Sequence, residues 1–470
     1  MSHYDRLSAL DASFLGIEDG DCHMHVGGVL VFEAGPLRTA EGGIDIERVR
    51  RGIASRLHFV PRFRQRLAYV PYERHPVWVD DDRFRLAYHV RHTALPRPGD
   101  ERTLKRLVGH IMSQPLDRSR PLWEMHFVEG LDGGRFALVS KTHHCMIDGV
   151  SGADLMTVIL EPVANPEAGE AEPWTPRPRP SEAELSLDAL SRRLSQPVEM
   201  LRAATEAVRD PRAAFGRLGQ GLSAIAETFA PALTPTSETP LNVEVGPHRR
   251  FDWTSLRVDE VKAVKKVHGG TLNDVVLATV AGALRKFLDE RGVDADRLQV
   301  RALVPVSVRA RDEQGALGNR VSQLTAPLPV HLDDPLKRLE AVRITMNGLK
   351  ESKQALGAEV LTAIAEWTAP NLLVQAVRLA ERSRPYNLVV TNVPGPQIPL
   401  YLLGARMLTT YPVVTLFHQI ALVVGLFSYD GGLHWGFTAD WEQVPDLHDF
   451  VLYVEEAFGE LQQAAATAGA

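Results

Sequence analysis

The arrangement of hydrophobic and polar positions divides the chain into three regions. In residues 1–165 short β-type runs alternate with helical ones, residues 166–247 are rich in proline, alanine and charge, and in residues 248–470 mixed strands and helices return. We therefore expect two domains of the α/β class with mixed sheets, joined by a long crossover.

Glycine-rich turns between apolar runs predict two β-hairpins. The first joins Leu122–Glu129 to Arg135–His144, and the second joins Ala421–Tyr429 to Leu433–Ala439. These hairpins are the most clearly defined β-elements of the two halves.

Further elements follow from composition and spacing. The valine-rich segment Leu298–Arg309 predicts a strand, which Pro305 places at an edge or a bulge because proline lacks a backbone donor. Apolar residues at helical spacing predict helices over Leu272–Glu290, Asp334–Ser352 and Glu359–Arg382.

The crossover has two parts of different character. Prolines prevent a regular helix between Glu161 and Pro180, so this stretch is predicted to be an exposed connector. An amphipathic helix follows, with apolar residues three and four positions apart and arginines between them. It packs on the protein's own surface or lies on a membrane, and the pattern leaves both open. The apolar positions are Leu187, Leu190, Leu194, Val198, Leu201 and Val208.

Composition is typical of a folded soluble protein. Hydrophobic residues make up 44% and charged residues 24%, and a net charge of −7 disfavours a nucleic-acid partner. Two cysteines are too few for a disulfide framework or a four-thiolate zinc site, so we expect a cytoplasmic protein. The N-terminus has no signal-peptide pattern, and no apolar run is long enough to cross a bilayer, so membrane contact is expected to be peripheral.

The most informative motif lies at the end of the predicted Arg135 strand, where the sequence reads His143-His144-x-x-x-Asp148-Gly149. Alternation along a strand sends the two histidines to opposite faces, with Ser140 and Thr142 on the side of His144. A neutral imidazole can take the proton of a hydroxyl or amine as it attacks an acyl carbon. The motif therefore predicts one histidine acting as a general base.

The role of the aspartate stays open between two arrangements. Gly149 frees the backbone for a turn that brings Asp148 back towards the histidine, where it orients the ring. Alternatively, Asp148 pairs with an arginine and holds the loop, and Arg309 at the end of the valine-rich strand is the candidate.

The motif has three other possible interpretations. A metal site would need both imidazoles to converge, whereas adjacent strand residues point apart. Cys145 as an acylated nucleophile faces away from His144 and so lacks a base. A purely structural histidine pair is the usual expectation for isolated histidines, but the spaced Asp-Gly favours chemistry. We therefore expect no metal.

Beyond this motif, the chain resembles the bacterial wax ester synthase/diacylglycerol acyltransferases. These belong to the superfamily of CoA-dependent acyltransferases, with chloramphenicol acetyltransferase and peptide-synthetase condensation domains. The histidine motif marks only the superfamily, and other segments narrow the match to the family. They are Leu7–Leu15, Met24–Gly28, Arg120–Glu124, Thr239–Asn242, Arg249–Phe251, Asn273–Ala278, Pro305–Arg309 with Gly318 and Asn319, and Thr391–Pro396.

The resemblance implies two chloramphenicol-acetyltransferase-like domains with a tunnel between them. The family's catalytic base corresponds to His144, and Asp148 and Gly149 match its supporting positions. The resemblance also implies transfer of a long acyl chain from acyl-CoA to a fatty alcohol or diacylglycerol, often at membranes or lipid inclusions. Acyl-CoA would be a co-substrate, with no permanently bound cofactor. Thr391 stands where a serine is common, which retains the hydroxyl.

Two further motifs each have a structural and a functional interpretation. Thr271 and Asp274 form a capping-box-like helix start, which stabilises a helix, but Asn273 could also donate to a developing oxyanion. Thr391 and Asn392 precede a proline-rich turn, where they satisfy loop backbone or lie near the substrate.

The predicted activity is therefore direct acyl transfer with His144 as the base. The alternatives are a superfamily transferase or condensation-type enzyme with another acceptor, or a non-catalytic protein that binds acyl-CoA or lipid droplets. We expect the protein in the cytoplasm, with peripheral contact to the inner membrane face or lipid inclusions.

Overall fold

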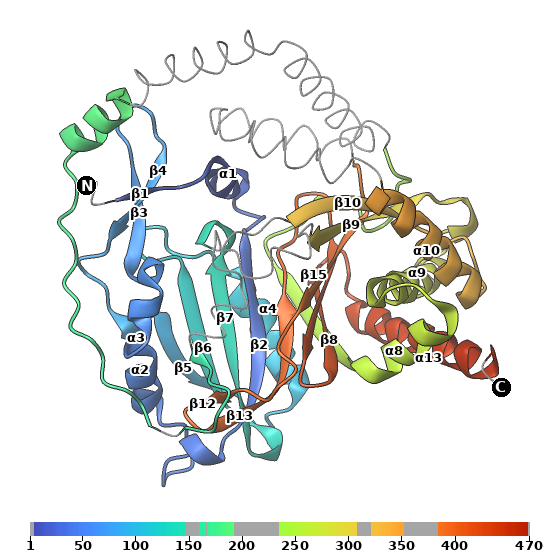
Figure 1. Ribbon diagram of the computed structural model, residues 1–470, viewed down its shortest axis with the longest axis horizontal. Helices are drawn as coiled ribbons and strands as arrows, with labels where there is room; N and C mark the ends of the chain where they lie inside the picture. Colours follow the sequence, from blue (N-terminus) through green and yellow to red (C-terminus); the bar gives the residue numbers. More distant parts are fainter. Residues whose placement is uncertain are drawn as a thin grey trace.

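The computed structural model describes residues 4–146, 159–165, 167–191, 235–307, 321–351 and 384–468. These residues form two six-stranded sheets and one three-stranded sheet, with helices packed against them. Figure 1 shows the two large sheets side by side, with α9 and α13 on the outer side of the second sheet. The predicted mixed α/β class is confirmed.

The first sheet has the strand order β12-β13-β2-β7-β6-β5. Its two faces carry separate cores because side chains alternate along β7: Ala137 and Val139 pack with helix α4, whereas Phe136 and Leu138 pack with the cluster that includes α2. The elements of this half are β2 (His25–Glu33), α2 (Ile46–Ala54), α3 (Leu86–His89), β5 (Val90–Ala94), α4 (Glu101–Ser113), β6 (Trp123–Leu131), β7 (Arg135–His143), β12 (Tyr401–Leu402) and β13 (Ala405–Val413).

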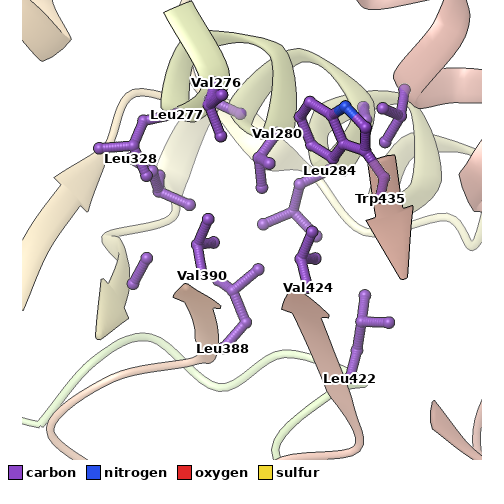
Figure 2. Packing of buried hydrophobic residues seen from close by; sticks show 14 of the residues in the cluster. Val276, Leu277, Val280, Leu284, Leu328, Leu388, Val390, Leu422, Val424 and Trp435 are labelled. Carbon is purple, nitrogen blue, oxygen red and sulfur yellow. The ribbon is translucent and has the colours of Figure 1, made fainter. Parts of the chain in front are cut away.

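The second sheet has the order β10-β9-β11-β14-β15-β8. Figure 2 shows its core, where Val276, Val280 and Leu284 of α9 face side chains such as Val390 and Val424 of the sheet. The elements are β8 (Arg249–Arg257), α8 (Val258–His268), α9 (Leu272–Glu290), β9 (Val300–Ser307), β10 (Val321–Leu328), α10 (Pro335–Glu351), β11 (Leu388–Pro394), β14 (Leu422–Tyr429), β15 (Gly432–Asp440) and α13 (Leu447–Ala468).

A small antiparallel sheet with the order β1-β4-β3 extends from the first half. A helix at residues 182–191 lies against it, with Leu185 and Ala189 packed on Val70 and Val77. The elements are β1 (Asp5–Arg6), α1 (Ala9–Ile17), β3 (Gln65–Tyr69) and β4 (Pro76–Asp80). Short 3-10 helices complete the described chain: η1 (Gly35–Leu37), η2 (Leu57–Phe59), η3 (Pro61–Arg64), η4 (Asp132–Gly134), η5 (His144–Met146) and η6 (Ala295–Arg297).

The two large sheets are linked by a strand that crosses between them. β13 comes from the C-terminal part of the chain yet pairs antiparallel with β2 of the first sheet. At Gly436 of β15 an added Cβ would lie 1.9 Å from the carbonyl oxygen of Pro412 in β13, so only glycine permits this approach. The boundaries expected from the sequence remain a prediction, and residues 248–470 supply two strands of the first sheet.

Most sequence-based elements lie where they were expected. Both hairpins form, and α9 has the predicted bounds. The strand that contains Pro305 was expected at the edge of a sheet, and this expectation is wrong because β9 lies between β10 and β11. However, the pairing of β9 with β11 ends at Leu303. The backbone N–H that Pro305 lacks is therefore not needed for a hydrogen bond between these two strands.

Two of the predicted helices lie wholly or partly outside the described residues. The predicted helix Glu359–Arg382 lies outside the described residues, as does the amphipathic segment beyond Ser191. In the part of the chain that the structure describes, no helix has the length and apolarity needed to span a bilayer.

Candidate active site

The candidate site begins where β7 ends. The backbone amide of His144 donates to the carbonyl of Met24 at 2.7 Å, and His143 pairs in register with His25 of β2. The backbones of β2 and β7 approach closely at Gly27, where an added Cβ would lie 1.9 Å from the carbonyl oxygen of Ser140. This approach keeps the backbone of β2 next to the motif.

A cavity of about 750 Å³ lies on the His144 side of β7. Both halves of the chain line it, as expected for an interdomain passage. Its wall is largely apolar, with Ser140, Thr142 and His144 from the end of β7. Further lining residues are Asp5, Val26, Gly27, Gly28, Leu30, Phe59, Val60, Pro61, Arg62, Phe63, Gln65, Asp80, Met146, Trp174, Thr175, Arg177, Thr391, Val393, Thr410, Pro412, Val413, Val414, Leu426 and Phe427.

His144 has the properties of a neutral base at the wall of this cavity. Its ring lies 4.1 Å from that of Phe14 in α1, measured between centroids. Burial, and to a smaller extent His143, lowers the pKa of His144 from 6.5 to about 4, against the opposing effect of a hydrogen bond with its own backbone. The imidazole is therefore uncharged near neutral pH and able to accept a proton.

His143 points away from the cavity into a polar cluster. Its Nε2 donates to Glu18 Oε2 at 2.5 Å, and its Nδ1 accepts from the amide of Cys145 at 3.1 Å. One ring thus connects a buried carboxylate to the backbone just after His144. The opposite directions of the two histidines agree with the alternation expected from the strand.

Glu18 is the centre of this cluster, although no role was predicted for it from the sequence. Arg118 donates to its carboxylate at 2.9 Å, and ring nitrogens of His23 and His25 lie 3.6 and 3.7 Å from Oε1. Burial opposes the charged form, but hydrogen bonds from His143 and Arg118, together with the nearby ring of His23, hold the pKa of Glu18 far below its usual range. The carboxylate is therefore charged.

A signal for Glu18 was present in the sequence. It follows α1 directly, at the helix C-terminus, where the helix dipole disfavours an acidic side chain. An acid in that position needs a cationic or hydrogen-bonding partner elsewhere. Its partner His143 is 125 residues away, so the pattern alone does not identify it.

Cys145 is not among the described residues that line the cavity. Its side chain is buried, and burial, together with the carboxylates of Asp11 and Glu18, raises the pKa of the thiol well above its ordinary value. A protonated thiol without a base is a poor nucleophile. The divergent histidines also offer no shared metal position, and the described residues contain no group of His, Cys, Asp and Glu suited to a metal ion.

The helix-start residues lie away from the cavity wall. Thr271 and Asp274 form a complete capping box at the start of α9, with the amide of Thr271 donating to Asp274 Oδ2 at 2.6 Å. Neither Asn273 nor Asp274 is among the described residues that line the cavity. Their arrangement agrees with the structural interpretation of this motif.

The remaining candidates fall into two groups. Thr391 of β11 lines the cavity, whereas the next residue, Asn392, does not belong to its described lining. Asp148, Gly149 and Arg309 lie outside the described residues, so their expected roles remain predictions. The structure therefore brings His144 and Thr391 to one cavity and assigns His143 to the opposite face.

Comparison with known proteins places the chain among acyltransferases. The wax ester synthase/diacylglycerol acyltransferase catalytic domain matches residues 7–276, and the WS/DGAT C-terminal domain matches residues 317–462. A protein of Mycobacterium tuberculosis strain H37Rv, named as a probable diacylglycerol O-acyltransferase, is 36% identical over 469 residues, which cover 98% of this chain and 99% of that protein.

Solved structures agree with these matches. The wax ester synthase/diacylglycerol acyltransferase from Marinobacter aquaeolei VT8 has a TM-score of 0.71 and 28% identity, covering 98% of this chain and 100% of that one. The first condensation domain of the calcium-dependent antibiotic synthetase has a TM-score of 0.61 over 100% of this chain and 98% of that one. At 17% identity it shows the fold alone. The resemblance found in the sequence is confirmed: the chain belongs to the wax ester synthase/diacylglycerol acyltransferase family of O-acyltransferase enzymes.

Proposed function

We propose that this protein transfers a long-chain acyl group from acyl-CoA directly to the hydroxyl of a fatty alcohol or diacylglycerol. The observation that carries the proposal is the neutral, half-buried imidazole of His144 at the wall of a large, mainly apolar cavity. A cavity of about 750 Å³ is within the usual size of ligand sites. Its apolar wall favours aliphatic chains over polar substrates.

The reaction needs one group that takes and returns a proton. His144 accepts the hydroxyl proton as the acceptor oxygen attacks the thioester carbon, which forms the C–O bond. The intermediate then collapses, the C–S bond breaks, and the imidazolium returns the proton to the CoA sulfur. Acyl-CoA is consumed as a co-substrate, so the chemistry requires no permanently bound cofactor.

The negative charge on the carbonyl oxygen needs a donor within the cavity. Of the expected support residues, Thr391 is the described one that lines the cavity, and its hydroxyl can donate a hydrogen bond. We assign it this role. Asn273 is a less suitable donor because it lies outside the described lining.

The first test combines an activity assay with removal of the base. Wild-type protein given palmitoyl-CoA and hexadecanol or a diacylglycerol should release free CoA, detected by a thiol reagent, and form ester, detected by mass spectrometry. His144→Ala should lower kcat by about 10²- to 10⁴-fold, the usual contribution of a general base.

The matched control is His434, a buried histidine of β15. Burial likewise lowers its pKa to about 4, but it bonds Ser255 in the second sheet and is not among the described residues that line the cavity. His434→Ala should retain most of the specific activity of its folded fraction. Equal losses in the two variants, or acyl-CoA binding by the wild type without any ester product, would contradict the proposal.

Glu18 is proposed as a positioning residue that acts through His143. The carboxylate orients the His143 ring, which in turn holds the amide of Cys145 and so the turn that carries His144. Glu18 itself does not line the cavity in the described structure. Asp148 is proposed to support the motif in one of the two ways that the sequence left open, by orienting the histidine ring or by pairing with Arg309.

Glu18→Gln should therefore lower both stability and turnover. Loss of the charge should reduce the free energy of unfolding at pH 7 by about 2 kcal/mol. Because the pKa of Glu18 is depressed by folding, its contribution is present above the ordinary value of 4.5 and diminishes as the pH falls below it. The stability difference between wild type and variant should shrink accordingly in denaturant titrations.

The kinetic signature separates positioning from general destabilisation. Turnover by Glu18→Gln should fall while the KM values of both substrates change little, because the cavity wall is intact. Glu33→Gln, an exposed glutamate at the end of β2, serves as the control and should match the wild type. A Glu18→Gln variant with unchanged stability and kcat would contradict the role.

We also propose that the protein works at a membrane or lipid-inclusion surface. The tip that joins β3 to β4 exposes Tyr69 and Tyr72, with exposed fractions of 44% and 98%. The neighbouring helix at residues 182–191 exposes Leu187 and Leu190, at 64% and 54%. Amphipathic aromatic rings and exposed leucines are suited to the interface of a bilayer.

Vesicle flotation tests this surface. Tyr72→Ser combined with Leu187→Ser should reduce the fraction that floats with phospholipid vesicles several-fold, because it removes apolar area from the contact. The control is Ile344→Ser on α10 in the second half. The exposed fraction of Ile344, 63%, is close to the 64% of Leu187, and the control should leave flotation unchanged. An unchanged bound fraction in the double variant, or an equal decrease in the control, would contradict this assignment.

A further inference from the structure

The proline-rich connector does more than join the two halves. After the ion pair between Arg56 and Glu161, the chain passes along the first half, where Ala168 packs against its core. Farther on, Trp174, Thr175 and Arg177 line the same cavity as His144. Figure 1 shows this segment running as a long extended strap beside the first half.

Two residues of the strap, Trp174 and Arg177, hold it against the cavity. The backbone amide, Nε and Nη2 of Arg177 donate to the Asp80 carboxylate at 2.9, 3.1 and 2.8 Å. The guanidinium of the buried Arg64 lies 5.0 Å from the Trp174 ring centre, and Phe84 meets this ring edge-on at 6.3 Å. Such paired and stacked contacts fix an otherwise irregular segment.

Charge at this end of the cavity is balanced. The described charged residues of the lining, besides His144, are two arginines and two aspartates, and they pair as Arg62 with Asp5 at 3.7 Å and Arg177 with Asp80. The phosphates of coenzyme A carry several negative charges, which a site with equal numbers of carboxylates and guanidinium groups attracts weakly. A neutral lipid carries no charge, so it does not need a positively charged site.

The apolar surface at this end matches an aliphatic chain. Phe59, Val60, Pro61 and Phe63 line the cavity together with the indole of Trp174. Phe59 is 67% exposed, so the cavity meets solvent here, near the end of the β3–β4 hairpin where Gln65 pairs with Asp80, opposite its tip. An aliphatic substrate can therefore enter the cavity at this end.

We propose that the Trp174–Arg177 strap is the wall of the passage that admits the uncharged acceptor, and that Trp174 provides its main apolar contact with the acceptor chain. This assignment rests on the proposed acyl transfer and gives that reaction a specificity residue in the connector. Fatty alcohol or diacylglycerol would enter past the strap, while acyl-CoA reaches His144 by another route.

Two substitutions test the strap in the full-length enzyme. Trp174→Ala should raise the KM for hexadecanol about tenfold, because it removes a large apolar contact, while the KM for palmitoyl-CoA and kcat at saturation stay within about twofold. Thr175→Trp places bulk on an exposed position of the wall. It should lower kcat/KM for diacylglycerol at least about tenfold relative to hexadecanol.

Trp441→Ala is the matched control. Trp441 is also partly exposed and stacks under an arginine, Arg250, at 4.0 Å, but it does not belong to the described cavity lining. The control should leave both KM values unchanged. A shift in the palmitoyl-CoA KM instead of the acceptor KM, or a Thr175→Trp variant with unaltered acceptor preference, would overturn the strap assignment. Wild-type protein that forms no ester would instead contradict the proposed function itself.

Discussion

Successive side chains of a β-strand point to opposite faces, and at the end of β7 this rule separates two neighbouring histidines into different electrostatic surroundings. His143 enters a polar cluster around a charged carboxylate, whereas His144 enters an apolar cavity that keeps it neutral. The two environments depend on each other, because the ring of His143 holds the backbone that directs His144. Much of the site's geometry follows from this division.

The second constraint is that the cavity needs walls from distant parts of the chain. β13 crosses from the C-terminal part into the first sheet, and the contact of Gly436 with Pro412 brings the second sheet against it. Trp253 of β8 and Tyr411 of β13 stack at 4.8 Å across the same boundary. The cavity is therefore a product of how the two halves join, and the connector completes its outer end.

The sequence predicted those features that depend on local rules. Helical spacing and a capping box defined α9, a glycine-rich turn defined the β6–β7 hairpin, and strand alternation gave the direction of His144. Features that depend on residues far apart in the chain could not be predicted from the sequence. Glu18 meets His143 across 125 residues, and Trp174 lies in a connector that composition describes only as exposed. A helix start offers backbone hydrogen-bond donors wherever it lies in the fold. The sequence around Asn273 therefore did not show whether these donors reach the cavity.

The pH dependence of kcat/KM tests the central claim most directly, because it reports the ionisation of the base in the free enzyme. Cavity burial lowers the pKa of His144 from 6.5 to about 4, so the imidazole stays neutral well below neutral pH. The account predicts a flat profile from about pH 5.5 to 8 for the wild-type enzyme. A loss of activity centred near pH 6.5 would show an ordinary, solvated histidine and would contradict the account.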